Sequence, residues 1–426
     1  MSEIRICGYR PLSGEIKIQG SKNGVLPMLA ASILQKETVK FTNVPTIQDV
    51  TCMVGILESL GCRCRWEGSS LTVDASECER SEIPKEDVGK MRSSILVMGA
   101  LLGRLGRAVT WYPGGCSIGS RPINLHLLAF SRLGARVQEE DGRIEASSAK
   151  LAGGPIILPF PSVGATENAL LAAVLAEGET QLLGAAREPE IQSLCLLLNQ
   201  MGADITGIGT SKLRIRGVRE LHGTEYSVPG DRIAAGTYLT AVAAAGGQAR
   251  LLGAPWDSMQ EVVKVLRQVG AEVEPVFGIG ENQKTNIEGI SISMEGRPKP
   301  ITLSTSPYPG FPTDLQSPML AVLARAEGVS RLKETVFEAR FKTANELWKM
   351  GADIEISGNE AVISGKHRLR GARVSACDLR GGAALVAAAL AAEGETRISD
   401  CIHIERGYED ICRDIQGLQG RIQRIP

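Results

Sequence analysis

Two kinds of helix pattern alternate along this chain and return at intervals of about 70 residues. One kind is apolar almost all round, as in GGAALVAAALAAEG at 381–394, and such helices belong in a protein interior. The other kind carries charges along one face, as in QEVVKVLRQVG at 260–270, and belongs at a surface or a sheet edge. Strand and hairpin patterns complete each interval, most clearly DGRIEAS at 141–147 and ISGNEAVISG at 356–365.

The amphipathic helix pattern of each interval ends in a glycine, which is the last residue of the strings SLG, RLG, QMG, QVG, KMG and a degenerate LQG. It suits the position after a helix, where a positive φ is needed. The spacings are 73, 68, 68, 81 and 69 residues between Gly61, Gly134, Gly202, Gly270, Gly351 and Gly420. This period is too long for ordinary solenoid repeats.

The fold predicted from this pattern is an α/β (α+β) protein with six pseudo-repeats of about 70 residues, split as three plus three. Each repeat reads as a buried helix, a strand, an amphipathic helix and a hairpin, with the sheets facing outward. The alternative is an ordinary doubly wound α/β protein whose helices happen to end in Leu-Gly.

Composition narrows the class of protein. The 426 residues are 43% hydrophobic and 22% charged, which is typical of globular domains and argues against disorder. Lys plus Arg is 47 and Asp plus Glu is 48, so a general nucleic-acid-binding surface is not expected. The longest uncharged stretch, 233–249, is too short for a membrane span, and no signal peptide is readable.

Cysteine and histidine positions argue against a metal site or a disulfide framework. The ten cysteines show no CxxC spacing and the four histidines are scattered. We therefore expect free thiols, a cytoplasmic protein and no metal.

The loop GGCSIGSRP at 114–122 lies between a strand pattern and a helix pattern. Pro122 suits the first helical position. Three glycines leave Cys116 few apolar neighbours, and Arg121 favours its reactive thiolate form; the alternative is a small buried cysteine. The loop also matches G-x-S-x-G around Ser117, but a hydrolase needs the helix to start at that serine, so we treat the match as chance.

Two helix starts carry further candidate site residues. Ser21, Lys22 and Asn23 stand where free helix N–H groups can face an anion; the alternative is a capping serine beside an exposed lysine. Asp314 precedes another apolar helix, as a cap or as a base aimed into a cleft.

Arginines recur at the starts of apolar helices and at strand ends. Guanidinium groups bind carboxylate and phosphate bidentately, so several from different repeats suggest one convergent anion pocket. The arginines are Arg92, Arg340, Arg380 and Arg406.

Ten strings, in order along nearly the whole chain, resemble the enolpyruvyl transferase family. They are GSKNG at 20–24, MRSSILVMGALL at 91–102, PGGCSIGSRPINLH at 113–126, PSVGATENALLAA at 161–173, REPEI at 187–191, GDRIAAGT at 230–237, PGFPTDLQ at 309–316, ETVFEARF at 334–341, DLRGGAALV at 378–386 and RGYEDI at 406–411. The cysteine loop and the SKN and RGYE strings resemble the members that act on UDP-N-acetylglucosamine more than the shikimate-pathway members.

The resemblance implies a two-lobed, inside-out α/β barrel with the active site in the cleft between the lobes. One lobe is 21–230, with the Cys116 lid loop and the nucleotide segment. The other is 1–20 plus 231–426, with Asp314 and Arg406, and the chain crosses between them near Gly20 and Gly230.

The implied reaction transfers the enolpyruvyl group of phosphoenolpyruvate to the 3-hydroxyl of UDP-N-acetylglucosamine and releases phosphate. By resemblance Cys116 is the general acid and can trap phosphoenolpyruvate covalently, while Asp314 is the general base. Lys22, Arg121 and Arg406 hold the phosphoenolpyruvate anions, with Asn23 nearby. The other substrate-binding residues implied are Arg92, Pro122, Ile123, Asn124, Leu125, Ser162, Val163, Gly164, Val336, Arg340 and Arg380. No cofactor is implied.

Three positions depart from the family pattern. Asn124 stands where members often have Asp, and Ala339 and Thr343 stand where they commonly have Asn and His. The last two put contacts of lobe closure in doubt more than the chemistry. Retention of Cys116 implies susceptibility to the epoxide antibiotic fosfomycin, which alkylates this thiol in the family.

Two alternatives to the UDP-sugar enzyme stay open. A shikimate-type enzyme is disfavoured because that family has no such cysteine loop. A non-catalytic paralogue that binds UDP-sugar is supported only by the three departures, and a binding protein needs neither acid nor base.

Overall fold

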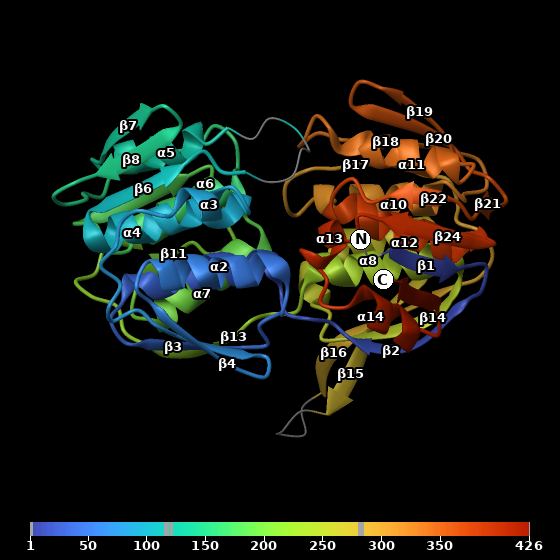
Figure 1. Ribbon diagram of the computed structural model, residues 1–426, viewed down its shortest axis with the longest axis horizontal. Coiled ribbons are helices and arrows are strands. Elements are labelled where there is room, and N and C mark those ends of the chain that lie inside the picture. The colour runs from blue at the N-terminus through green and yellow to red at the C-terminus, as the bar shows by residue number, and fades with distance from the viewer. Residues whose placement is uncertain (1–2, 115–118, 120–121, 280–284, 426) are drawn as a thin grey trace. The chain divides into compact units, whose positions relative to one another are not determined.

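The computed structural model describes residues 3–114, 119, 122–279 and 285–425 (Figure 1). The described chain divides into two compact units. Of these residues, unit 1 contains 3–19, 119, 230–279 and 285–425, and unit 2 contains 20–114 and 122–229. No helix in these residues is long and apolar enough to cross a membrane, and the nine cysteines described are free thiols.

Each unit is built on three buried helices. In unit 1 these helices contact one another, and nearly all of their residues are buried: α8 (Arg232–Ala245), α10 (Gln316–Leu323) and α12 (Leu379–Ala391). In unit 2, α4 (Val97–Leu105) contacts both α1 (Lys22–Ala31) and α6 (Val163–Ala173). A side chain at Gly99 of α4 would lie 2.6 Å from the backbone oxygen of Asn168, so glycine permits this close packing.

Three sheets flank the buried helices of each unit. Those of unit 1 combine β1 (Glu3–Cys7), β22 (Arg373–Ser375), β24 (Glu395–Ser399) and β25 (Arg421–Ile425); β2 (Leu12–Lys17), β14 (Gly247–Leu252), β15 (Glu272–Ile279) and β16 (Thr285–Met294); and β17 (Thr302–Ser304), β18 (Val329–Lys333), β19 (Asp353–Ser357) and β20 (Glu360–Ser364). Those of unit 2 combine β3 (Thr38–Thr42), β4 (Arg63–Glu67), β5 (Ser70–Asp74) and β13 (Thr224–Ser227); β6 (Arg107–Trp111), β7 (Arg136–Glu140) and β8 (Arg143–Ser147); and β9 (Pro155–Ile157), β10 (Glu179–Leu183), β11 (Asp204–Thr206) and β12 (Lys212–Arg216). A further two-stranded sheet in unit 1 pairs β21 (Leu369–Arg370) with β23 (Ala392–Glu393).

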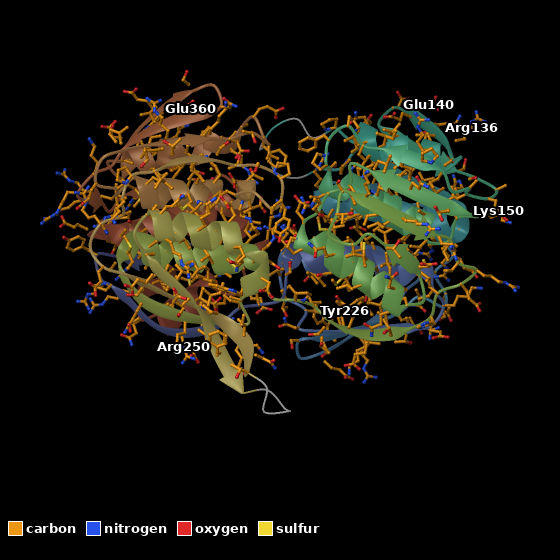
Figure 2. The ribbon with its side chains drawn as sticks, turned by 180° about the vertical axis from the view of Figure 1, so that it is seen from behind. Arg136, Glu140, Lys150, Tyr226, Arg250 and Glu360 are labelled. Carbon is orange, nitrogen blue, oxygen red and sulfur yellow. The ribbon has the colours of Figure 1, made fainter. Side chains whose placement is uncertain are left out.

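One face of each sheet lies outward. Along β12, Leu213 and Ile215 are buried while the alternating Lys212, Arg214 and Arg216 are exposed. Figure 2 shows Arg136 of β7 and Arg250 of β14 pointing away from the body of their units. The prediction of an α/β fold with buried helices and outward-facing sheets is therefore confirmed, with separate sheets among the described strands rather than a closed ladder.

Amphipathic helices complete the repeats in the predicted order. They are α2 (Gln48–Ser59), α5 (Asn124–Arg132), α7 (Pro189–Gln200), α9 (Gln260–Gln268), α11 (Thr343–Lys349) and α14 (Ile411–Gly417). The sequence pattern missed one element, a short strand that precedes the buried helix. In three repeats that strand pairs in parallel with the strand after the helix: β9 with β10, β17 with β18 and β22 with β24.

The other two strands of this kind exchange partners. The strand before α1 is β2, and it pairs with β14 of unit 1. The strand before α8 is β13, and it pairs with β3 of unit 2. Each unit is therefore completed by a strand that leads directly into the other unit's first buried helix.

The last repeat is completed from the opposite end of the chain. Strand β1 lies between β24 and β25, so the N-terminal strand supplies one strand of the final hairpin. The prediction that Gly420 follows the last helix was wrong by one residue. Helix α14 ends at Gly417, and Gln419 has the positive φ of 60°.

The positive φ of a glycine after an amphipathic helix implies that replacing this glycine lowers the stability of the protein. Gly134 has a φ of +86° and open space where a Cβ would lie, so Gly134→Ala changes backbone strain without a clash. We expect a loss of about 1 kcal/mol, because left-handed backbone costs other residues roughly this much. Gly55, inside α2 with equally open space, is the matched control. Gly55→Ala should gain about 0.5–1 kcal/mol, and equal effects in urea unfolding would refute the argument.

Candidate functional site

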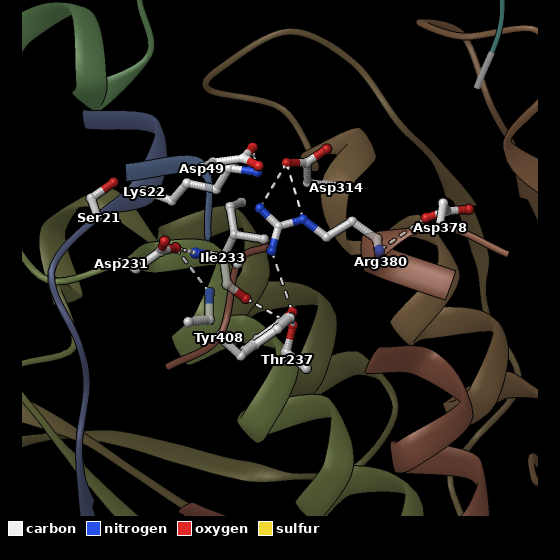
Figure 3. A network of polar contacts seen from close by, with 12 residues as sticks. Ser21, Lys22, Asp49, Asp231, Ile233, Thr237, Asp314, Asp378, Arg380 and Tyr408 are labelled. Atoms are coloured by element: carbon white, nitrogen blue, oxygen red, sulfur yellow. Dashed lines mark hydrogen bonds and ion pairs between the residues drawn. The ribbon is translucent and has the colours of Figure 1, made fainter. Parts of the chain in front are cut away.

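A cluster of charged side chains lies where the buried helices of unit 1 begin. Asp378 caps α12 by accepting the N–H groups of Arg380 and Gly381, both at 2.9 Å. This fixes the start of the helix that carries Arg380. Arg380 is 3% exposed, and its side-chain Nε and Nη2 donate to Oδ2 of Asp314 at 3.3 and 3.1 Å (Figure 3).

Asp314 is shared by two arginines. It lies on the 3₁₀ turn η4 (Thr313–Leu315), directly before α10. Its other oxygen pairs with Arg340 on η5 (Arg340–Lys342), which is also 3% exposed. Two buried guanidinium groups on one carboxylate leave a net positive charge, and such charge acts over longer range away from bulk water.

A directed chain of hydrogen bonds holds Arg380 from the other side. Its Nη1 donates to the Tyr408 hydroxyl at 3.3 Å. Thr237 of α8 uses its single hydroxyl hydrogen on the carbonyl of Ile233, so the contact of 2.8 Å with Tyr408 has the tyrosine as donor. The chain therefore ties the starts of α12 and α8 through one tyrosine (Figure 3).

The pKa shifts of Arg380 and Tyr408 indicate that each keeps one charge state within this hydrogen-bond chain. Burial by itself lowers the pKa of Arg380, but Asp314 and Tyr408 outweigh it and raise the pKa above its usual value. Burial raises the pKa of Tyr408, although Arg380 and Thr237 oppose the shift. Arg380 is thus charged and Tyr408 neutral across the physiological pH range.

Unit 2 holds Lys22 in a buried ion pair. Ser21 caps α1, since its hydroxyl accepts the N–H of Gly24 at 3.1 Å. Lys22 is 8% exposed, and its Nζ lies 2.7 Å from Oδ2 of Asp49 on α2. The capping serine is confirmed, and the alternative of an exposed lysine was wrong. Asn23 is half-buried in the same first turn.

The residues expected at the nucleotide come from three segments that Asn168 of α6 ties together. Its Nδ2 donates to Ile95 of η2 (Arg92–Leu96) at 3.0 Å and lies 2.7 Å from Nδ1 of His126 on α5. Its Oδ1 accepts the N–H of Gly99 at 2.8 Å. A side chain at Gly164 would lie 3.0 Å from the His126 ring, so the 162–164 and 122–126 segments adjoin.

The remaining predicted residues lie as follows. Cys116 and Arg121 lie outside the described residues. Helix α5 begins at Asn124, so the prediction of Pro122 as its first residue was wrong: Pro122 is exposed before the N-cap Ile123. Those with intermediate exposure are Arg92, Leu125, Ser162, Val163, Val336 and Arg406, the last directly after α13 (Ile402–Glu405).

Ala339 and Thr343, two of the three departures from the family pattern, lie close to Arg340 and Arg380 in the chain or in space. Ala339 directly precedes Arg340 on η5. Thr343 is fully buried at the start of α11, with its hydroxyl 3.8 Å from Sγ of Cys377 and close against Gly381. Asn124, by contrast, is exposed.

The structure adds residues that sequence reasoning did not assign. Asp49, Asn168, Asp231 and Tyr408 are buried polar groups at helix starts or between buried helices. The signal available was a polar residue inside an otherwise apolar segment, as Asn168 is in PSVGATENALLAA. Within the described residues, no group of three or more His, Cys, Asp or Glu side chains is arranged to hold a metal ion.

A further buried carboxyl group lies in unit 2. Glu167 of α6 is 4% exposed, and burial raises its pKa well above the usual value, with the charges of Glu190 and Glu188 acting in the same direction. It follows the Ser162 cap of α6 within the first two turns, so its charge state bears on the segment expected at the nucleotide.

Comparison with known proteins gives a consistent result. The model of the family described as EPSP synthase (3-phosphoshikimate 1-carboxyvinyltransferase) matches residues 6–415. UDP-N-acetylglucosamine 1-carboxyvinyltransferase 2 of Caldanaerobacter subterraneus is 44% identical over 426 residues, covering 100% of both chains. The protein of the same name from Carboxydothermus hydrogenoformans is 45% identical over 425 residues, again covering 100% of both.

Solved structures agree at the level of the fold. The enolpyruvyl transferase NikO from Streptomyces tendae superposes with a TM-score of 0.88 at 25% identity, covering 100% of this chain and 99% of the other. EPSP synthase from Acinetobacter baumannii superposes with a TM-score of 0.77 at 20% identity, covering 100% of both chains.

Because Asp314 compensates two buried arginines, its loss should lower stability more than the loss of an exposed carboxylate. Asp314→Asn leaves two buried guanidinium groups without their anion, and we expect a loss of about 3 kcal/mol or more. The exposed pair between Glu261 and Lys264 on α9 is the control, with side chains 33% and 61% exposed. Glu261→Gln should change stability by less than about 1 kcal/mol. Similar losses in urea unfolding for both variants would contradict the argument that Asp314 compensates two buried guanidinium groups.

The raised pKa of Glu167 predicts that the stability of the protein falls as pH rises. Because its folded pKa is raised, the folded state holds a proton that the unfolded chain loses above about pH 4.3. Stability should therefore fall as pH rises from there towards the folded pKa. Glu167→Gln should remove this fall, so the variant gains on the native chain as pH rises above about 4.3. Parallel stability curves for the two chains would show that the carboxyl is not perturbed.

Proposed function

The chain belongs to the EPSP synthase family of enolpyruvyl transferases, and we propose that within it Cys116 and Asp314 serve transfer to UDP-N-acetylglucosamine. The reaction moves the enolpyruvyl group of phosphoenolpyruvate to the 3-hydroxyl of the sugar and releases phosphate, as the first committed step of peptidoglycan synthesis. The observation that carries it is 44% and 45% identity, over the full length of both chains, to relatives named UDP-N-acetylglucosamine 1-carboxyvinyltransferase.

The chemistry needs one acid and one base in succession. A base takes the proton of the 3-hydroxyl while the oxygen bonds to C2 of phosphoenolpyruvate and an acid protonates C3. The resulting intermediate then loses a proton from C3 and its C2–O bond to phosphate, which restores the double bond. We assign the acid to Cys116 and the base to Asp314.

The positive charge in unit 1 supports the assignment of Asp314. A carboxylate that accepts N–H groups from two guanidinium groups is held in one place, as a base that must meet one hydroxyl requires. Nε of Arg340 is buried and has no hydrogen-bond partner among the described residues. It is a donor suited to an anionic intermediate.

The remaining roles follow the same chemistry. Lys22, Arg121 and Arg406, with Asn23, are proposed to hold the carboxylate and phosphate of phosphoenolpyruvate. The proposed nucleotide and sugar residues are Arg92, Pro122, Ile123, Asn124, Leu125, Ser162, Val163, Gly164 and Val336. Arg340 and Arg380 are proposed as further substrate-binding residues. The contacts of Asn168 support the nucleotide group, because they fix three of its segments against one another.

We also propose that the reaction takes place in the cytoplasm. Both substrates are metabolites of that compartment, and free thiols suit its reducing conditions.

Phosphate release from phosphoenolpyruvate tests the function directly. We expect release with UDP-N-acetylglucosamine and none with shikimate 3-phosphate, the acceptor of the family's other branch. Cys116→Ala should lose this release by a factor of about 100 or more, since general acid catalysis contributes at least that much. Cys116→Asp should retain part of it, because a carboxyl group can donate the proton.

Fosfomycin distinguishes the cysteine's role from a structural one. It should abolish release by the native chain and by Cys64→Ala, a control at a half-buried thiol of β4, but not by Cys116→Asp. Binding of the UDP-sugar with no release from either acceptor would overturn the enzyme and favour a regulatory paralogue.

A further inference from the structure

Gln19 is a buried amide at the point where the chain leaves unit 1. It follows β2, is 9% exposed, and lies three residues before Lys22. Its backbone carbonyl accepts the N–H of Asp231 at 2.9 Å, and Asp231 caps α8 with its side chain. The residue therefore already joins one helix start of the site cluster through its backbone.

The side chain of Gln19 binds the loop that follows Arg406. Its Nε2 donates to the carbonyl of Gly407 at 3.0 Å, and its Oε1 accepts the N–H of Glu409 at 2.9 Å. The amide therefore pairs with the loop backbone as a neighbouring β-strand would. It donates one hydrogen bond and accepts one, and its two backbone partners flank Tyr408. These partners lie 388 and 390 residues away in the sequence.

The same loop is fixed on its other side by α12. A side chain at Gly407 would lie 2.8 Å from the Leu379 side chain, so the loop backbone packs directly on the first turn of that helix. The Tyr408 hydroxyl is held by Arg380 and Thr237. With Gln19 on one side and α12 on the other, the backbone that carries Arg406 has little freedom to shift.

We propose that Gln19 is a positioning residue for the phosphoenolpyruvate anion, because it sets the direction of Arg406 through the peptide groups of Gly407 and Glu409. The proposal rests on the function proposed above, in which Arg406 and Lys22 hold that anion. One short segment, 19–22, thus carries one of the proposed cations, Lys22, and fixes the backbone beside another, Arg406. Gln19 itself touches no reacting atom in this assignment.

Steady-state kinetics separate this role from a purely structural one. Gln19→Leu keeps the size of the side chain and removes both hydrogen bonds. We expect the KM for phosphoenolpyruvate to rise about tenfold or more, because two buried peptide groups lose their partners and the loop relaxes. The KM for UDP-N-acetylglucosamine should stay within about twofold, because Gln19 has no part in the nucleotide segments.

Gln35 provides a matched control in unit 2. It is 2% exposed, its Nε2 donates to the carbonyl of Ser32 at 3.1 Å, and its Oε1 accepts the N–H of Glu37. Gln35→Leu therefore removes the same pair of backbone bonds away from the Arg406 loop. It should lower stability in urea unfolding as Gln19→Leu does, and leave the KM for phosphoenolpyruvate unchanged.

Gln19→Asn keeps the amide but withdraws it by one methylene, and it serves if the leucine variant does not fold. It should raise the KM for phosphoenolpyruvate by a smaller factor than Gln19→Leu. A Gln19 variant that folds with an unchanged KM, or a Gln35→Leu chain with an equal rise, would overturn the positioning role while leaving the proposed function intact. A native chain with no phosphate release would instead overturn the proposed function.

Discussion

Burial of apolar helices against one another is the constraint on which both units depend. Helices α8, α10 and α12 are buried along nearly their whole length, and their only charged residues, Arg232 and Arg380, stand in first turns. The first turn of a helix has N–H groups without helical partners and the positive end of its dipole. Caps, carboxylates and arginines therefore collect where the buried helices begin, and Lys22, Asp314 and Arg380 lie there.

Each charged group at the helix starts of unit 1 is held by a specific partner. Asp314 compensates two guanidinium groups that are each 3% exposed, and Tyr408 supplies a neutral contact to one of them. Asp378 and Asp231 are engaged by backbone N–H groups of their own helices. The cluster thus holds the proposed base between two guanidinium groups, which suit a reaction whose intermediate carries anionic groups.

The exchange of β2 and β13 places Gln19 where it can act. If β2 paired with the strand after its own helix, as β9 does with β10, the segment before Lys22 would lie in unit 2 alone. Because β2 pairs with β14 instead, Gln19 lies beside Asp231 and the loop after Arg406. The connection that joins the two units therefore also carries site residues.

The sequence by itself determined the repeat, the buried helices and the outward-facing sheets, because these depend on periodicity and on glycine at positive φ, which are local. It also indicated Lys22, Asp314, Arg340 and Arg380, because charges beside apolar helices stand out. It did not reveal the three-residue strands, the place of β1 within the last sheet, or Gln419 in place of Gly420. Only the tertiary structure decided that Lys22 meets Asp49, that two arginines share Asp314, and that Gln19 binds a loop 388 residues away. Such pairings depend on which strands exchange and which helix starts meet, and a hydrogen bond between distant residues leaves no periodic trace in a single sequence.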